Sequence, residues 1–163
     1  MTQAFGRPIN GEISPTTPPT PQAPEAQFIE ALDRLLDVEG VTSVRWEGYT
    51  PYFNDGDACE YGVNEASVSL DFGDEEGGEM DDGFYSEWDL YEFGEGDTWE
   101  ERYRNRTHTV NGKDAAHVSK ALKEFNKTLT GGQHNELLKR LFGDHAQVTA
   151  TREGFDVEFY DHE

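Results

Sequence analysis

The chain has 163 residues, of which 34% are hydrophobic, and a formal net charge of −21 from 34 acidic and 13 basic side chains. The negative charge argues against direct binding to nucleic acid or an anionic membrane, because phosphate would be repelled, and no apolar run approaches the roughly 20 residues that cross a bilayer. A single cysteine excludes an intramolecular disulfide and suits a reducing compartment. We therefore expect a soluble cytoplasmic protein with neither nucleic acid nor a membrane as direct partner.

Residues 1–24 are expected to form a disordered arm rich in proline and threonine. Six of the seven prolines fall in this segment, a composition typical of an extended chain without a core of its own. From residue 25 onward apolar side chains recur with helical spacing, and Gly40 follows where a left-handed cap can end a helix. The pattern predicts a helix over residues 25–38, at the start of one domain that covers residues 25–163.

The next segment predicts two paired strands. Apolar and polar side chains alternate after Val41, which predicts a strand over residues 42–53. The sequence NDGD at residues 54–57 is a strong hairpin-turn signal, because Asn, Asp and Gly tolerate positive φ. A returning strand is expected over residues 59–72, with a break near residues 64–66.

The region after this hairpin is predicted to hold an acidic loop and a second strand pair. Residues 73–83 form the glycine-rich loop, residues 84–93 are aromatic and β-prone, and residues 103–110 resemble a partner strand. Arg102, Arg104 and Arg106 would then share one strand face. There they either form a phosphate-contacting strip or, as we expect, pair with the acids of the neighbouring strand, namely Glu87, Asp89 or Glu92.

Two helices and a hairpin are expected at the C-terminal end, over residues 113–129 and 132–142, then 146–150 and 155–159. A capping box from Thr130 to Gln133 would open the second helix, and Gly143 would close it. Strands joined by short turns pair antiparallel, so the sequence predicts an α+β fold with an antiparallel sheet of about five or six strands and about three helices. The expected common core contains Leu35, Val44, Trp46 and Phe125.

Residues 46–59, WEGYTPYFNDGDAC, resemble a group of uncharacterised proteins found chiefly in bacteriophages, which share the motif W-x-x-Y-T-P-Y-F-N-D-G-D-x-C. The end of the chain is similar to theirs as well, in FGDH at residues 142–145, TATREG at residues 149–154 and YDH at residues 160–162. The resemblance implies no catalytic role. It implies a phage origin, and with it a role in interfering with host machinery in the host cytoplasm.

The acidic residues are concentrated in one segment. Residues 47–101 contain nineteen Asp and Glu and no Lys, Arg or His, whereas the rest of the chain holds fifteen acids and thirteen bases. The same segment has eleven aromatic residues, which a disordered acidic tail lacks. We therefore expect a folded element that displays carboxylates and buries its rings. Self-repulsion of this strength lowers stability, which favours a functional use over a surface that merely keeps the protein soluble or adapts it to salt.

The predicted partner-binding surface is a ridge of acids within residues 71–101. Side chains two apart on a strand project from one face about 6.6–7 Å apart, a geometry that Glu87 and Asp89 would share. The whole predicted set is Asp71, Asp74, Glu75, Glu76, Glu79, Asp81, Asp82, Glu87 and Asp89. Such a ridge would mimic nucleic-acid charge and inhibit a host nucleic-acid-binding protein by occupying its basic cleft.

Two alternatives remain at this stage. The acids could ligate Ca²⁺ or Mg²⁺ in a metal-binding protein or a small metal-assisted enzyme, although no window fits the D-x-[DN]-x-[DN]-G-x₅-E calcium loop. A phage structural or accessory protein that docks through its proline arm is the other alternative. The histidines lack zinc-ligand spacing, Cys59 is expected to be a buried strand residue, and no hydrolase or phosphate-loop motif occurs. We therefore predict no catalytic residue, no metal site and no cofactor.

Overall fold

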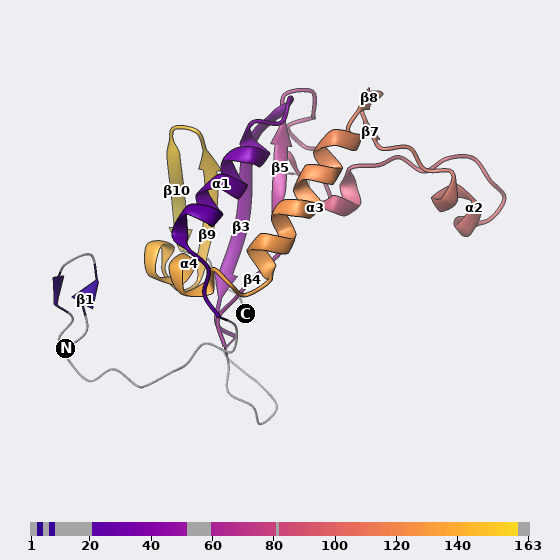
Figure 1. The fold of residues 1–163 in the computed structure, drawn as a ribbon. Helices are drawn as coiled ribbons and strands as arrows, with labels where there is room; N and C mark the ends of the chain where they lie inside the picture. Colours follow the sequence, from indigo (N-terminus) through magenta and orange to yellow (C-terminus); the bar gives the residue numbers. More distant parts are fainter. Residues whose placement is uncertain (1–2, 5–6, 9–20, 52–59, 81, 160–163) are drawn as a thin grey trace.

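The alternating segment after Gly40 forms the central strand of an antiparallel sheet, in a computed structural model that describes residues 3–4, 7–8, 21–51, 60–80 and 82–159 (Figure 1). The strands of this sheet are β3 (Val41–Tyr49), β4 (Gly62–Val63), β5 (Ser67–Leu70), β6 (Phe84–Tyr85), β9 (Ala146–Thr151) and β10 (Gly154–Phe159). Their order is β10-β9-β3-β5-β6, and β4 also pairs with β3. The predicted break near residues 64–66 therefore separates β4 from β5.

Three amphipathic helices cover one face of the sheet (Figure 1). They are α1 (Glu25–Leu36), α3 (Ala116–Thr130) and α4 (Asn135–Phe142). Each helix turns its apolar stripe inward, because apolar side chains three and four residues apart share a helical face. Gly143 has a φ of 91° at the C-cap of α4, as predicted. Gly40 has a φ of 95° in the turn from α1 to β3, but the C-cap of α1 is Asp37, so the prediction that Gly40 caps this helix is wrong. The predicted α+β class is confirmed.

Trp46 lies at the centre of the core between the sheet and the helices. Its indole ring is 5.8 Å from Phe28, 6.1 Å from Phe125 and 6.0 Å from Phe142, measured between ring centroids. The four residues predicted to share the core are each at most 2% exposed: Leu35, Val44, Trp46 and Phe125. The sequence pattern therefore identified both the strand face and the helix face that meet.

The N-terminal arm is described in part. A two-stranded ladder joins β1 (Gln3–Ala4) to β2 (Arg7–Pro8). The Gln22 side chain donates a hydrogen bond to the Gly132 carbonyl, and the Ala23 N–H donates to the Gln133 carbonyl, so residues 22 and 23 pack on the turn between α3 and α4. Residues 1–2, 5–6 and 9–20 of the predicted disordered arm lie outside the described residues, as do the predicted turn at residues 54–57 and Cys59.

The strand predicted over residues 84–93 is wrong beyond Tyr85. Ser86 and Asp89 form a reciprocal capping box that opens a 3-10 helix, η1 (Glu87–Asp89). Thr98 caps a second short helix, α2 (Trp99–Arg104), by accepting a hydrogen bond from the Glu101 N–H. Side-chain caps stabilise helical turns here, and they override the strand propensity of the aromatic residues.

The partner strand predicted over residues 103–110 is reduced to β7 (Thr109–Val110), which pairs with β8 (Lys113–Asp114). The turn between them contains Asn111 and Gly112 at φ 52° and 78°, the positive values that a tight Asn-Gly hairpin requires. Because β8 occupies residues 113 and 114, α3 begins at Ala116, later than predicted. Of the pairing expected between residues 84–93 and 103–110, the described residues form one isolated antiparallel β-bridge, between Glu92 and Thr107.

The capping box predicted from Thr130 to Gln133 is also wrong. Thr130 is the last residue of α3, where its hydroxyl donates to the Asn126 carbonyl, and it does not stand at the N-cap of α4. Helix α4 begins at Asn135, and His134 stands at its N-cap position without a capping hydrogen bond from its side chain. His134 is 1% exposed and lies 5.5 Å from the Phe28 ring. Neither of its ring nitrogens has a hydrogen-bond partner in the described part of the chain.

We expect the buried His134 to make the protein less stable in mild acid. Burial lowers the pKa of His134 below its ordinary value near 6.5, so this imidazole stays neutral in the folded state. As the pH falls below about 6.5 the unfolded chain takes up the proton first, and the free energy of unfolding decreases until the lowered folded pKa is reached.

The measurement is the melting temperature of wild type and His134→Phe at pH 7.5 and pH 5.5. The phenylalanine cannot be protonated, so the variant should lose less stability on acidification than wild type. His117→Gln removes an exposed histidine and serves as the control, which should behave as wild type does. Identical pH dependence of all three proteins would contradict the role assigned to His134.

Candidate partner-binding surface

The acidic loop is folded around Tyr85 over residues 71–80 and 82–83, the part of it that the structure describes. The Tyr85 hydroxyl accepts a hydrogen bond of 2.9 Å from the Asp74 N–H, while its ring is 95% buried. A Cβ atom at Gly77 would overlap this hydroxyl, and one at Gly73 would crowd the ring. The glycines therefore let the loop close over the tyrosine, which explains why a loop so rich in acids also contains so much glycine.

Backbone hydrogen bonds fix the loop at several further points. The Asp71 N–H donates to the Gly40 carbonyl at 2.8 Å, and the Gly83 N–H donates to the Gly77 carbonyl at 2.9 Å. The Glu79 N–H approaches Oδ2 of Asp89 at 3.3 Å. The loop is thus attached to the turn after α1, to itself and to η1, so its side chains project from a fixed backbone.

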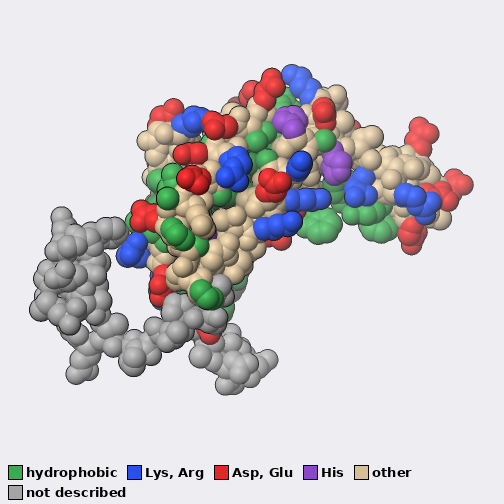
Figure 2. Space-filling model, viewed as in Figure 1, with side chains coloured by type: hydrophobic (Ala, Val, Ile, Leu, Met, Phe, Trp, Pro, Cys, Tyr) green, Lys and Arg blue, Asp and Glu red, His purple; other side chains and the backbone are tan. Residues whose placement is uncertain are grey.

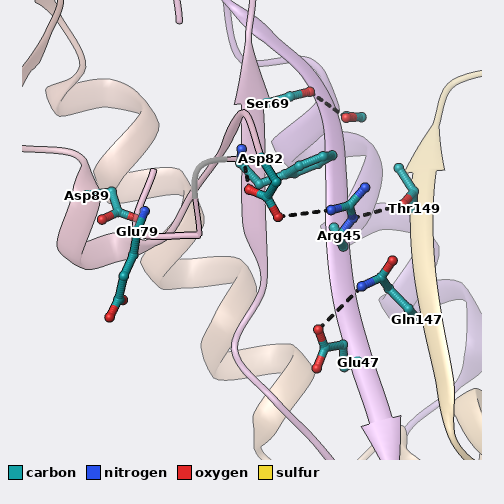
Figure 3. Close-up of polar contacts among 10 residues, drawn as sticks. Arg45, Glu47, Ser69, Glu79, Asp82, Asp89, Gln147 and Thr149 are labelled. Carbon is teal, nitrogen blue, oxygen red and sulfur yellow. Dashed lines mark hydrogen bonds and ion pairs between the residues drawn. The ribbon is translucent and has the colours of Figure 1, made fainter. Parts of the chain in front are cut away.

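Most of the predicted acids are exposed on this loop. Asp71, Asp74, Glu75, Glu76, Glu79 and Asp82 are exposed, and Asp81 lies outside the described residues. Within the described part of the chain the first five take part in no ion pair. Asp82 differs, because its carboxylate pairs with Nη1 of Arg45 at 3.2 Å (Figure 3). Five negative charges therefore have no compensating cation among the described residues.

Glu87 and Asp89 have a different environment from the other predicted acids. Both are half-buried in η1, so the prediction that they project from one strand face is wrong. Oδ2 of Asp89 accepts hydrogen bonds from the Ser86 N–H and hydroxyl, and Oε2 of Glu87 accepts one of 2.7 Å from the Asn126 side chain. These two carboxylates hold the fold together around the acidic loop.

The arginines also lie differently from the prediction. Arg102 and Arg104 are in α2, so they do not share a strand face with Arg106. None of the three pairs with Glu87, Asp89 or Glu92 in the described part of the chain. The Arg106 guanidinium instead lies 4.0 Å from the Tyr103 ring centroid and donates to the Tyr103 carbonyl at 3.0 Å.

Residues 91–107 form an aromatic lobe that extends away from the sheet and carries α2 (Figure 1). Its rings pack on one another: Trp99 stacks on Tyr103 at 5.3 Å, and Tyr91 meets Phe93 edge to face at 5.6 Å. Phe93 and Trp99 are nevertheless 53% and 57% exposed, and Trp88 at the base of the lobe is 66% exposed. The expectation that the rings of the acidic segment are buried is correct for Tyr85 and wrong for these three.

Sequence reasoning missed this exposed aromatic surface, although a signal for it was present. Thr98 and Glu101 have the T-x-x-E spacing of a helix N-terminus, and Trp99 and Tyr103 are four residues apart, the spacing of neighbours on a helix. Hydrophobic side chains gather at the surface between the sheet and α2 (Figure 2). A pocket of ≈ 100 Å³ lies there, with Trp88, Arg106 and Lys123 among its lining residues.

Residues 46–51 and residues 142–154, the described parts of the two sequence blocks singled out above, are neighbours in space. β3 pairs with β9 along the sheet, and the Asp144 carboxylate accepts hydrogen bonds from the Thr50 N–H at 2.8 Å and the Thr50 hydroxyl at 2.6 Å. Burial by itself would raise the pKa of Asp144, but these hydrogen bonds and His145 hold it below its usual value. Burial, together with the Asp144 charge, raises the pKa of Tyr61 to about 12.

No protein-family model, curated protein or solved structure matches this chain. Its function is therefore inferred from its surface. None of the helices among the described residues is long and apolar enough to cross a membrane. Among the same residues no three His, Cys, Asp or Glu side chains converge into a group that could hold a metal ion. The exposed features of the acidic segment are thus carboxylates on a fixed loop and aromatic rings on a neighbouring lobe.

Proposed function

We propose that this protein is a binding inhibitor whose acidic loop imitates nucleic-acid charge and occupies the basic cleft of a host nucleic-acid-binding protein. The observation that carries the proposal is a set of five exposed carboxylates on an ordered backbone, none of which forms an ion pair with another described residue: Asp71, Asp74, Glu75, Glu76 and Glu79. A fixed array binds with less loss of conformational entropy than a mobile acidic tail. The phage resemblance of residues 46–59 supports a host protein as the target.

The distribution of charge supports binding over a general solubilising role. Figure 2 shows Lys and Arg side chains mixed with Asp and Glu over the helical layer. Residues 47–101, by contrast, contain no base. Charges that served solubility would not need to be gathered on one loop. A concentrated field accelerates association with a basic cleft and makes it sensitive to salt.

The test is an isosteric variant of the acidic loop that combines Asp74→Asn, Glu75→Gln, Glu76→Gln and Glu79→Gln. These side chains make no hydrogen bond or ion pair within the described residues, so the fold should survive, and reduced self-repulsion should leave the melting temperature unchanged or slightly higher. The matched control removes four exposed carboxylates from the helices, as Glu30→Gln, Asp33→Asn, Glu124→Gln and Glu136→Gln.

The measurement starts from bacterial DNA-binding proteins retained on immobilised DNA. The amount of these proteins that is released is compared after addition of wild type, the control or the loop variant. Wild type and control should displace them at 50 mM NaCl and much less at 300 mM, because exposed charges are screened beyond a Debye length of about 10 Å at 0.1 M. The loop variant should displace them weakly at either salt concentration. Equal displacement by the loop variant and the control, with the same salt dependence, would remove the proposal.

A further inference from the structure

The edge strand β10 has two chemically different faces. Its register pairs Phe155 with Ala150 and Val157 with Val148, so its apolar side chains point toward the helical layer. Phe155, Val157 and Phe159 are nevertheless 41%, 46% and 75% exposed. They form an apolar stripe that reaches α4, where Phe142 lies 5.1 Å from Phe155 between ring centroids and Leu141 is 47% exposed.

The opposite face of β10 is acidic. Thr149 and Gln147 lie on the sheet face away from the helices (Figure 3), and in the register of the ladder Asp156 and Glu158 stand opposite them. Both acids are exposed, and neither forms an ion pair within the described part of the chain. Apolar and negative side chains therefore alternate along β10 with the period of two that separates the faces of a strand.

The outer edge of β10 is open for pairing. β10 is last in the strand order, and no strand in the described part of the chain pairs with its outer edge. Exposed edges present N–H and C=O groups to other chains, and proteins commonly block them with a bulge, a proline, a short strand or charged side chains. β10 has no bulge and no proline, because its six residues pair with β9 in unbroken register. Its two charged side chains are both acidic, so they disfavour pairing with another acidic strand and leave pairing with a basic one open.

A second copy of this chain is a poor occupant of that edge. With Val157 aligned on its counterpart, Asp156 would stand opposite Glu158 of the other copy, and like charges directly opposed are destabilising. A shift by one residue would place acids opposite apolar side chains. The net charge of −21 adds to the repulsion. A partner with basic side chains avoids both problems.

We propose that β10 is a docking edge for an extended segment of a partner protein in which apolar and basic residues alternate. The partner backbone extends the sheet by hydrogen bonding, its apolar side chains cover Phe155 and Val157, and its Lys or Arg side chains face Asp156 and Glu158. This surface does not depend on the proposed function, because β10 and β6, which adjoins the acidic loop, stand at opposite ends of the strand order.

The probe is the peptide acetyl-Lys-Val-Lys-Phe-Lys-Val-Lys-amide, added to the isotopically labelled full chain. Binding should shift the backbone resonances of β10 and slow the exchange of its outward amide hydrogens. The control peptides have the same residues in separate blocks of Lys and apolar residues, or N-methyl groups along the backbone edge that would face β10. Both should bind at least about tenfold more weakly, since they lose the alternation or the backbone hydrogen bonds.

Two variants assign the binding to side chains. Asp156→Asn with Glu158→Gln should weaken binding about tenfold, in keeping with the loss of two cross-strand charge pairs, whereas the nearby Glu153→Gln should leave it unchanged. The fourfold acidic-loop variant should bind the peptide as wild type does, so failure of this inference and failure of the proposed function are distinguishable. Equal binding of the N-methylated peptide, shifts confined to the acidic loop, or dimers of the free chain in sedimentation would each overturn the inference.

Discussion

Trp46→Ala is expected to lower the free energy of unfolding by about 3–5 kcal/mol, the range for truncating a large buried aromatic side chain. Trp46 is 2% exposed and contacts Phe28 and Phe125, which belong to α1 and α3. Its removal would leave a cavity where the sheet meets both helices. Urea denaturation followed by circular dichroism measures the effect without relying on tryptophan emission.

Trp88→Ala is the matched control for this substitution. Trp88 is the same residue type but is 66% exposed in η1, so its truncation should change the free energy of unfolding by about 0.5 kcal/mol or less. Similar losses in the two variants would show that the packing around Trp46 is not what stabilises the fold.

The second large effect is expected at Asn126, where Asn126→Ala should lower the free energy of unfolding by about 2–4 kcal/mol. Asn126 is 4% exposed; its Oδ1 accepts a hydrogen bond of 2.7 Å from the Ala66 N–H, and its Nδ2 donates one to Glu87. Truncation leaves a buried N–H and a half-buried carboxylate unsatisfied, at a cost of about 1–3 kcal/mol for each buried group. Asn64→Ala, at an exposed position, is the control.

A double-mutant cycle then isolates the bond between Asn126 and Glu87. Glu87→Gln should be less costly in the Asn126→Ala background than in wild type, because the partner of the carboxylate is already gone. Purely additive losses would contradict this bond. The same experiment asks whether Glu87 acts inside the fold, as its geometry indicates, or at the surface as the sequence pattern suggested.

The sequence predicted most of the sheet and the helices that cover it, because the buried side chains recur at every second residue in a strand and at every third or fourth residue in a helix. β3 alternates around Val44 and Trp46, and α1 repeats Phe28, Leu32 and Leu35 on one face. Both elements therefore carry their burial pattern in their own residues. The C-terminal hairpin was predicted for the same reason.

The segment over residues 84–110 was not predictable in this way. Its aromatic residues favour a strand by propensity, but the side chains of Ser86 and Thr98 cap short helices. The capping hydrogen bonds of these side chains determined the local structure there, and the β-propensity of the aromatic residues did not. The role of Glu87 depended on Asn126, a partner 39 positions along the chain, which no local pattern reveals. Six carboxylates of the predicted site are exposed as expected, five of them without an ion pair in the described part of the chain, while the exposed rings beside them were missed.

The three tryptophans lie in two different environments, so intrinsic tryptophan fluorescence can report on binding at one end of the molecule. Trp46 is shielded by the core, whereas Trp88 and Trp99 are in contact with water within the acidic segment. Emission from the exposed pair is accessible to an uncharged quencher such as acrylamide, which the negative field does not repel, and shifts to shorter wavelength when a bound protein excludes solvent from the lobe. Trp46 supplies a constant background, so engagement of this end of the molecule can be followed in real time without any attached dye.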